Sequence, residues 1–128
     1  MQFRQIRIFQ KQMKRLVKKY RSLPSDIEKL QQVLLVYPEG NGSKHWNRLQ
    51  VSDDGFIAIF KVRLSCASLR GKADFRIVYA WNKKDDSLVL LDFIEVYFKG
   101  EQGNEDRTLI EEYLDDVPIY PALLAQVC

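Results

Sequence analysis

The pattern of hydrophobic and polar positions predicts a β-sheet in the middle of the chain. Three runs rich in Ile, Val, Phe, Tyr and Trp span residues 56–64, 75–81 and 87–98, and polar or glycine-containing segments separate them. These residue types favour strands, and short polar joints favour antiparallel neighbours. We therefore predict a three-stranded antiparallel meander.

Apolar residues recur at helical spacing on both sides of this meander. Before it, the spacing predicts an amphipathic helix over residues 9–21 and a second helix over residues 25–37, with Pro24 at the break between them. Because their connection is short, we expect these two helices to pack as an antiparallel hairpin on one face of the sheet. After the meander, the spacing predicts a short helix over residues 105–114.

The remaining segments are less regular. Residues 1–9 alternate in part and suit either a short strand or the approach to the first helix, and residues 43–55 form a polar segment before the first long strand. The apolar tail 117–128 is expected to pack on the domain or against a partner. Together these features predict a single α+β domain over residues 1–128, with a core at about residues 3–114.

Composition limits the class of protein. With 128 residues and 46% hydrophobic content, the chain is long enough to bury a core of its own. Residues 1–49 hold 11 Lys and Arg against 3 Asp and Glu, a net charge of +8, whereas residues 101–128 hold 1 against 7, a net charge of −6. This asymmetry indicates either an anionic partner for the basic half or charge matching within the chain.

Several classes of protein lack support in the sequence. No run approaches the roughly 20 apolar residues of a membrane span, and the start has no apolar signal-peptide core, so we expect a cytoplasmic protein. Cys66 and Cys128 are interpreted as free thiols. The sequence has no phosphate-binding loop, nucleophile elbow or Cys/His ligand set, and we predict neither a metal nor a cofactor. His45, the single histidine, is interpreted as structural or solvent-exposed.

Cations interrupt the apolar strands at particular places. Lys61 and Arg63 are two residues apart, so they share one face of a strand. With Arg76 in the second strand and Lys99 after the third, they could form a surface for a polyanion. The alternative is that Lys61 and Arg63 are solvated residues of a half-exposed strand. Alternation also places Asp92 and Glu95 on opposite faces, which argues against a catalytic carboxylate pair.

The order helix, helix, strand, strand, strand, together with these cations, resembles the RelE/ParE superfamily of bacterial toxin–antitoxin toxins. The resemblance covers about residues 3–114. It rests on the basic segment 18–26 (Lys-Lys-Tyr-Arg-Ser-Leu-Pro-Ser-Asp) and on four motifs in the central part of the chain. These are residues 60–64 (Phe-Lys-Val-Arg-Leu), 69–72 (Leu-Arg-Gly-Lys), 75–79 (Phe-Arg-Ile-Val-Tyr) and 94–101 (Ile-Glu-Val-Tyr-Phe-Lys-Gly-Glu).

The resemblance implies a compact toxin that a co-expressed antitoxin neutralises. Many members cut mRNA on the ribosome, and we expect this chain to be such a metal-independent endoribonuclease. The alternatives are a non-catalytic inhibitor of DNA gyrase and an inactive relative that only binds an antitoxin. The expected partners are the cognate antitoxin and mRNA on the ribosome, with operator DNA bound only through the antitoxin complex and no membrane partner.

The resemblance also implies a set of catalytic residues. Lys61 and Arg63 match a lysine-x-lysine pair of the first long strand, and Arg76 matches an arginine of the second. Lys99 matches the basic residue after the last strand, and Tyr97 lies in a tyrosine-x-lysine form found in part of the superfamily. Some relatives carry a histidine at the C-terminal end of the sheet, where this chain has none, so the general base is unassigned; Tyr97 and Tyr113 both stay candidates for the family's late tyrosine.

Overall fold

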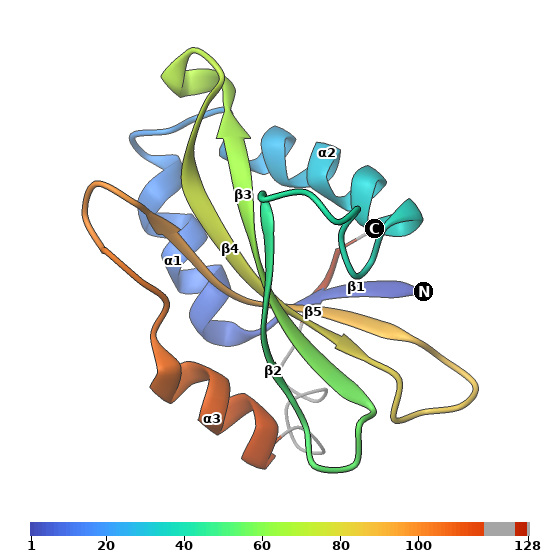
Figure 1. The fold of residues 1–128 in the computed structure, drawn as a ribbon. Helices are drawn as coiled ribbons and strands as arrows, with labels where there is room; N and C mark the ends of the chain where they lie inside the picture. Colours follow the sequence, from blue (N-terminus) through green and yellow to red (C-terminus); the bar gives the residue numbers. More distant parts are fainter. Residues whose placement is uncertain (117–124, 128) are drawn as a thin grey trace.

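The computed structural model describes residues 1–116 and 125–127 and has an α+β fold, as predicted (Figure 1). The strands form one six-stranded sheet in the order β2-β3-β4-β5-β1-β6. The strands are β1 (Gln2–Gln5), β2 (Trp46–Val51), β3 (Ile57–Cys66), β4 (Lys72–Asn82), β5 (Leu90–Phe98) and β6 (Ala125–Val127). The helices are α1 (Arg7–Val17), α2 (Leu23–Val36) and α3 (Arg107–Asp116), with a 3₁₀ turn, η1 (Ala67–Leu69).

The predicted meander is confirmed by β3, β4 and β5, which pair antiparallel in sequence order. The sheet as a whole is mixed, because β1 lies parallel to β5, with Gln2 opposite Leu90 and Gln5 opposite Phe93. The predicted antiparallel strands therefore form only part of a larger, mixed sheet. A parallel pair needs a long crossover, and here most of the chain, including α1 and α2, separates the two strands.

The polar segment 43–55 contains a strand that was not predicted. β2 pairs antiparallel with β3, with Trp46 opposite Val62 and Val51 opposite Ala58. It is an edge strand whose side chains are half-buried or exposed. Since an edge strand buries little surface, its apolar pattern is weak, and its hydrogen bonds come from a neighbour that the local sequence does not reveal.

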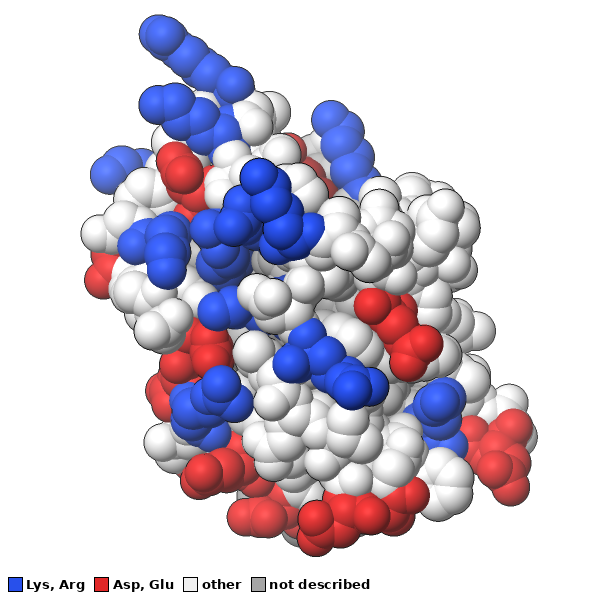
Figure 2. All heavy atoms as spheres, viewed as in Figure 1, with Lys and Arg blue, Asp and Glu red and all other residues white. Residues whose placement is uncertain are grey.

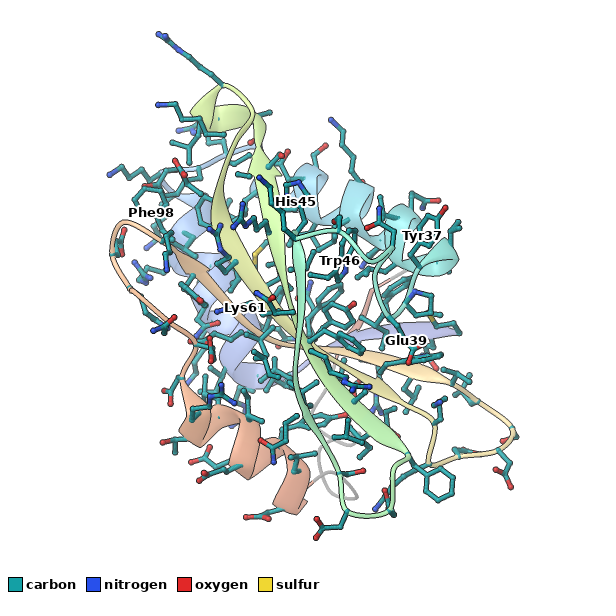
Figure 3. All side chains as sticks on the ribbon, viewed as in Figure 1. Tyr37, Glu39, His45, Trp46, Lys61 and Phe98 are labelled. Carbon is teal, nitrogen blue, oxygen red and sulfur yellow. The ribbon has the colours of Figure 1, made fainter. Side chains whose placement is uncertain are left out.

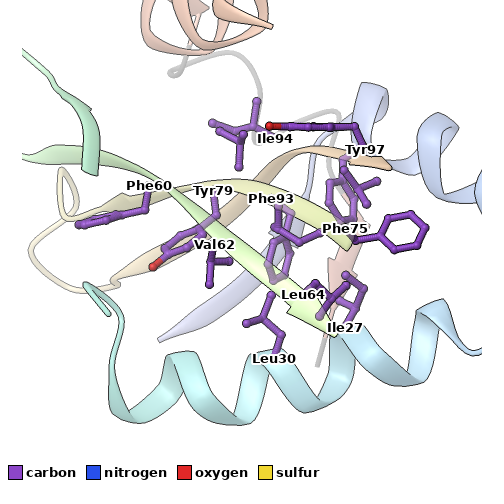
Figure 4. Close-up of a cluster of buried hydrophobic side chains, with 14 of the residues drawn as sticks. Ile27, Leu30, Phe60, Val62, Leu64, Phe75, Tyr79, Phe93, Ile94 and Tyr97 are labelled. Atoms are coloured by element: carbon purple, nitrogen blue, oxygen red, sulfur yellow. The ribbon is translucent and has the colours of Figure 1, made fainter. Parts of the chain in front are cut away.

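Both early helices lie over the same hydrophobic core. α1 contacts β5, where the Phe9 and Phe93 rings stack 5.3 Å apart, and α2 contacts β3. Leu16, Leu30 and Ile77 are all buried in this core. The close-up in Figure 4 shows α2 beneath the side chains of β3 and β4. The predicted helices are shifted, because α1 ends at Val17 and α2 already begins at Leu23, with proline in its first turn.

The other face of the sheet is covered in part by α3, which contacts β5. A buried polar network lies at this contact. The Arg4 guanidinium donates to both carboxylate oxygens of Asp92 at 2.6 and 2.8 Å, and the Tyr113 hydroxyl donates to Asp92 at 2.6 Å. Such a buried charge is tolerated only when its hydrogen bonds are satisfied. Tyr113 is thus a core residue rather than the free tyrosine of a site.

A bulge in β5 reverses one prediction about its carboxylates. Val78 and Ala80, which share a face of β4, lie opposite Glu95 and Asp92, so both acids point to the α3 face of the sheet. Ile94 is the extra residue, and Figure 4 shows it on the same side as Tyr97 and opposite Phe93. The prediction that the two acids lie on opposite faces is wrong, because strict alternation fails at a bulge.

The C-terminal tail is described only at residues 125–127, which form β6 and pair with β1. This part of the tail therefore packs on the domain. The rest of the predicted apolar tail, including Cys128, lies outside the described residues. Cys66 is a buried free thiol. In the described part of the chain, no helix is both long and apolar enough to cross a membrane.

Candidate functional site

Four cations meet on the open half of the face that α3 partly covers. They line a cavity of about 190 Å³, together with the N-terminal end of β2; the lining residues are His45, Asn47, Lys61, Val62, Arg63, Arg76 and Lys99. Figure 2 shows Lys and Arg gathered over the upper part of the molecule and acidic side chains gathered at its lower end. The predicted convergence of Lys61, Arg63, Arg76 and Lys99 is therefore observed.

Strand register is what brings the arginines together. Arg63 lies opposite Arg76 across β3 and β4, and Arg76 lies opposite Tyr97 across β4 and β5. Directly opposed residues point to the same face of a sheet, so the three side chains form one row. Like charges opposite each other destabilise a sheet. A pair of arginines in this position is consistent with a site that binds anions.

Tyr97 lies beneath this cavity rather than in it. Its side chain is 2% exposed, and its hydroxyl has no hydrogen-bond partner among the described residues. Burial, with the negative charges of Glu105 and Glu95, raises the pKa of Tyr97 to about 12. A buried hydroxyl with so high a pKa is a poor general base at neutral pH, so Tyr97 is better placed to support Arg76.

Lys61 is not free. Its Nζ lies 2.7 Å from Oε1 of Glu105, and the two side chains are 15% and 7% exposed. Glu105 also pairs with Arg107 at 2.9 Å. Burial favours the neutral carboxyl, but the hydrogen bond from Lys61 and the two positive charges outweigh it and lower the pKa of Glu105. The charge of Lys61 is therefore compensated within the chain.

The other three cations have no acidic partner among the described residues. Arg76 donates from Nη1 to the carbonyls of Ala73 at 2.7 Å and Phe75 at 3.1 Å, and Lys99 donates to the carbonyl of Gly103. These bonds orient the side chains without neutralising them. Arg63 is exposed, and its guanidinium has no hydrogen-bond or ion-pair partner in the part of the chain that the structure describes. Three positive charges thus remain available at the cavity.

One residue of the site, His45, was not predicted from the sequence. His45 immediately precedes β2, and its carbonyl accepts a hydrogen bond from the Arg63 backbone N–H at 3.0 Å. This bond holds His45 at the rim of the cavity, where its side chain is exposed (Figure 3). Only the pairing of β2 with β3 brings His45 to Arg63. The sequence signal of that strand is short, because only Leu49 and Val51 alternate with polar neighbours.

A second carboxylate holds the loop that follows β5. Glu95 is buried and accepts hydrogen bonds from Nε2 of Gln102 at 2.8 Å and from the backbone N–H of Asp106 at 2.9 Å. Burial is the main cause that raises the pKa of Glu95, and the charges of Asp106 and Glu105 add to it. Glu95 thereby fixes the segment that carries Glu105 to Lys61.

The chain has no match among protein-family models, curated proteins or solved structures. Among the described residues, no group of three or more His, Cys, Asp or Glu side chains is placed to hold a metal ion. The site is therefore interpreted from its own chemistry. Permanently charged guanidinium groups bind phosphate through two parallel hydrogen bonds. This arrangement of cations suits a phosphate group.

Proposed function

We propose that the chain is the toxin of a RelE/ParE-type toxin–antitoxin pair, a metal-independent endoribonuclease that cleaves mRNA on the ribosome and so inhibits translation. The observation that carries the proposal is the cavity in which Arg63, Arg76 and Lys99 lie with His45. Contact between α1 and α2 on the face opposite this cavity supports the helical hairpin expected of that superfamily.

The proposed chemistry is transfer of an RNA phosphate from the 5′-oxygen of the leaving nucleotide to the neighbouring 2′-oxygen. A base removes the proton of the 2′-hydroxyl, the 2′-oxygen attacks the phosphorus in line, and an acid protonates the departing 5′-oxygen. Arg63 and Arg76 bind the phosphate and stabilise the charge that develops on it. His45 is assigned a proton transfer in this reaction, because the two other candidates are unsuited to it. Lys61 is paired with Glu105, and Tyr97 is buried.

Lys61 and Lys99 have supporting roles in this proposal. Lys99 adds positive charge at the cavity, where its carbonyl contact leaves its charge uncompensated. Lys61 contributes to phosphate binding once RNA displaces Glu105 from it. Tyr97 lies opposite Arg76 in the sheet and supports it from below. These assignments keep all five sequence-predicted residues in the site. Of the five, the four cations line the cavity and Tyr97 does not.

The ion pair of Lys61 with Glu105 favours a second candidate function. A lysine that is compensated within the chain is a weak catalyst, and a cationic face without catalysis would suit a protein that only binds. Such a protein would be a gyrase inhibitor or an inactive relative that pairs with an antitoxin. In either case the partners proposed are a cognate antitoxin in the cytoplasm and, through that complex, operator DNA.

The two candidates are distinguished by induced expression in bacteria. A ribonuclease stops incorporation of radiolabelled methionine first and leaves new 5′ ends within mRNA, which primer extension detects. A gyrase inhibitor stops thymidine incorporation first and leaves mRNA intact. Co-expression with the adjacent reading frame, followed by affinity purification, tests for an antitoxin. A chain that is abundant and harmless in cells and co-purifies with no small protein would contradict the toxin proposal.

A further inference from the structure

A groove adjoins the cationic cavity and runs between β3 and α2. Its volume of about 420 Å³ lies within the range of about 300–1,000 Å³ that is typical of small-molecule sites. Both surfaces share His45, Val62 and Arg63, so a ligand in the cavity can extend around the edge of β3 into the groove. The larger apolar side chains of the groove are Leu30, Val33, Trp46, Val62 and Leu64.

One residue of β3 has free backbone groups beside this groove. The N–H of Arg63 donates to the carbonyl of His45 at 3.0 Å, and the N–H of Ala67 is bonded to the carboxylate of Asp26. Backbone groups of alternate strand residues point to the same edge, so those of Ser65 point to the edge that β2 does not reach. Among the described residues, no strand pairs with Ser65 on that side.

A single free N–H and a single free C=O match the edge of a nucleobase. Each of the four RNA bases carries a hydrogen-bond donor next to an acceptor on its Watson–Crick edge, and proteins read unpaired bases through that edge. An added strand would need such groups on several residues in a row. The backbone of Ser65 is therefore too short for a strand and sufficient for one base.

The charges around the groove suit a nucleotide. Lys29 and Arg63 line it and are exposed, so positive charge lies at its rim and continues into the cavity. Asp26 also lines the groove, but it is buried, and its carboxylate accepts a hydrogen bond from the Ser22 hydroxyl at 2.8 Å. The two surfaces together offer cations to a phosphate and an apolar wall to a base.

We propose that the groove is the subsite for an unpaired RNA base next to the phosphate in the cavity. The edge of the base bonds to the N–H and C=O of Ser65, so the base lies in the plane of the sheet, where a longer β2 would run. One face of the base packs on Val33 of α2. The other face is turned to the side of the sheet that carries Arg63, whose guanidinium stacks on it.

This subsite gives the site a preference that the cations alone do not give. Base-paired RNA uses the Watson–Crick edge for its own pairing, so only a single strand can present that edge to Ser65. That the ligand is RNA rests on the proposed function. The subsite adds that the nucleotide beside the bound phosphate must carry an unpaired base.

The first test compares two fluorescein-labelled RNA hexamers with the same number of phosphates, hexaadenylate and a hexamer of abasic sites. Fluorescence anisotropy with the purified full chain measures both affinities. We expect hexaadenylate to bind at least about tenfold more tightly, because stacking of one base typically contributes that much. Equal affinities would overturn the inference.

A pair of variants tests whether this preference comes from the groove. Val33→Glu puts a carboxylate against the base and should bring the two affinities together. Val51→Glu is the matched control, since Val51 on β2 is as exposed as Val33 (41% and 40%) and lies outside the groove. It should keep the wild-type ratio. Both variants add one negative charge, and the abasic hexamer measures the effect of that charge on phosphate binding. Equal ratios in the two variants would also overturn the inference.

Heteronuclear NMR of the isotope-labelled chain tests the position of the base. The backbone amide signal of Ser65 should shift more with hexaadenylate than with the abasic hexamer, because only the former supplies a hydrogen-bond acceptor from a base. Equal shifts with the two hexamers would contradict the assignment of Ser65.

The subsite and the proposed function fail in different ways. If neither hexamer binds, or if Arg76→Ala leaves the binding of both unchanged, the cavity holds no RNA phosphate and the ribonuclease proposal is contradicted together with the subsite. If Arg76→Ala weakens both hexamers but the wild-type chain binds them equally, the subsite alone is overturned.

Discussion

The ammonium group of Lys61 and the carboxylate of Glu105 form a nearly buried ion pair, with Nζ and Oε1 2.7 Å apart. Lys61 lies on β3, and Glu105 lies just before α3, in the loop that Glu95 fixes. The carboxylate occupies the place next to Lys61 that a phosphate oxygen would take. Any RNA that uses Lys61 must first displace Glu105.

Glu105→Gln should therefore strengthen RNA binding. The substitution frees the charge of Lys61 for one more phosphate, and a single-strand contact steepens the slope of log K against log salt concentration by about 0.7. Fluorescence anisotropy with a labelled oligoribonucleotide at several salt concentrations measures both quantities. The control is Glu101→Gln, since Glu101 pairs only at the exposed surface with Arg15, at 3.3 Å. An unchanged slope for Glu105→Gln would show that Lys61 takes no part in binding.

Arg76→Ala should abolish toxicity while the protein stays folded. Loss of one group that stabilises a transition-state oxyanion typically costs about 10² to 10³ in rate. The variant also loses the bonds to the Ala73 and Phe75 carbonyls, each worth about 1 kcal/mol. Growth after induction and thermal unfolding separate the two effects. Lys14→Ala, an exposed cation on α1, should leave both unchanged. A folded Arg76→Ala protein with full toxicity would remove the enzyme proposal.

His45→Gln should lower the cleavage rate without weakening RNA binding to the same degree. Positioned general acids and bases contribute about 10²- to 10⁴-fold. Single-turnover cleavage measures the rate, and fluorescence anisotropy measures RNA binding. Asn47→Ala changes another residue of the same cavity and should keep the wild-type cleavage rate. An unchanged cleavage rate in His45→Gln would assign proton transfer to another group.

Tyr113→Phe should destabilise the fold without changing the site. The hydroxyl donates to Asp92 at 2.6 Å and accepts from Nδ2 of Asn82 at 3.2 Å. Its loss removes one bond from the buried Asp92 carboxylate, which keeps those from Arg4, and takes away the acceptor of the buried Asn82 amide. Such losses cost about 1–3 kcal/mol. Urea denaturation measures the change, with Tyr37→Phe as the exposed control. Equal stability of the two variants would show that the network at Asp92 adjusts without the hydroxyl.

The raised pKa of Glu95 predicts a pH dependence of stability. Because burial raises this pKa above its ordinary value of 4.5, folding favours the protonated carboxyl. The resulting stabilisation is present below about pH 4.5 and is lost as the pH rises through the folded-state pKa. Glu95→Gln keeps a neutral side chain at every pH, so its stability relative to wild type should increase over the same rise. Thermal unfolding from pH 4 to pH 8 measures this difference, and a constant difference would contradict the assignment.

Patterns among residues that are close in the sequence determined much of the secondary structure of this protein. The β-rich runs specified the meander, because alternation along a strand is a local property. The same alternation places Lys61 and Arg63 on one face of β3, whatever the strand pairs with. Helical spacing located α1, α2 and α3 to within a few residues, since an apolar stripe repeats every turn.

Tertiary structure decided what depends on partners distant in the sequence. The pairing of β2 with β3 brought His45 to the cavity, a bulge turned Asp92 and Glu95 to one face, and Glu105 compensated Lys61 across 44 positions of the chain. Edge strands, bulges and ion pairs gain their free energy from these neighbours and leave little periodic trace of their own. The sequence therefore determined which side chains could share a face, and the packed sheet decided which of them met and which remained charged.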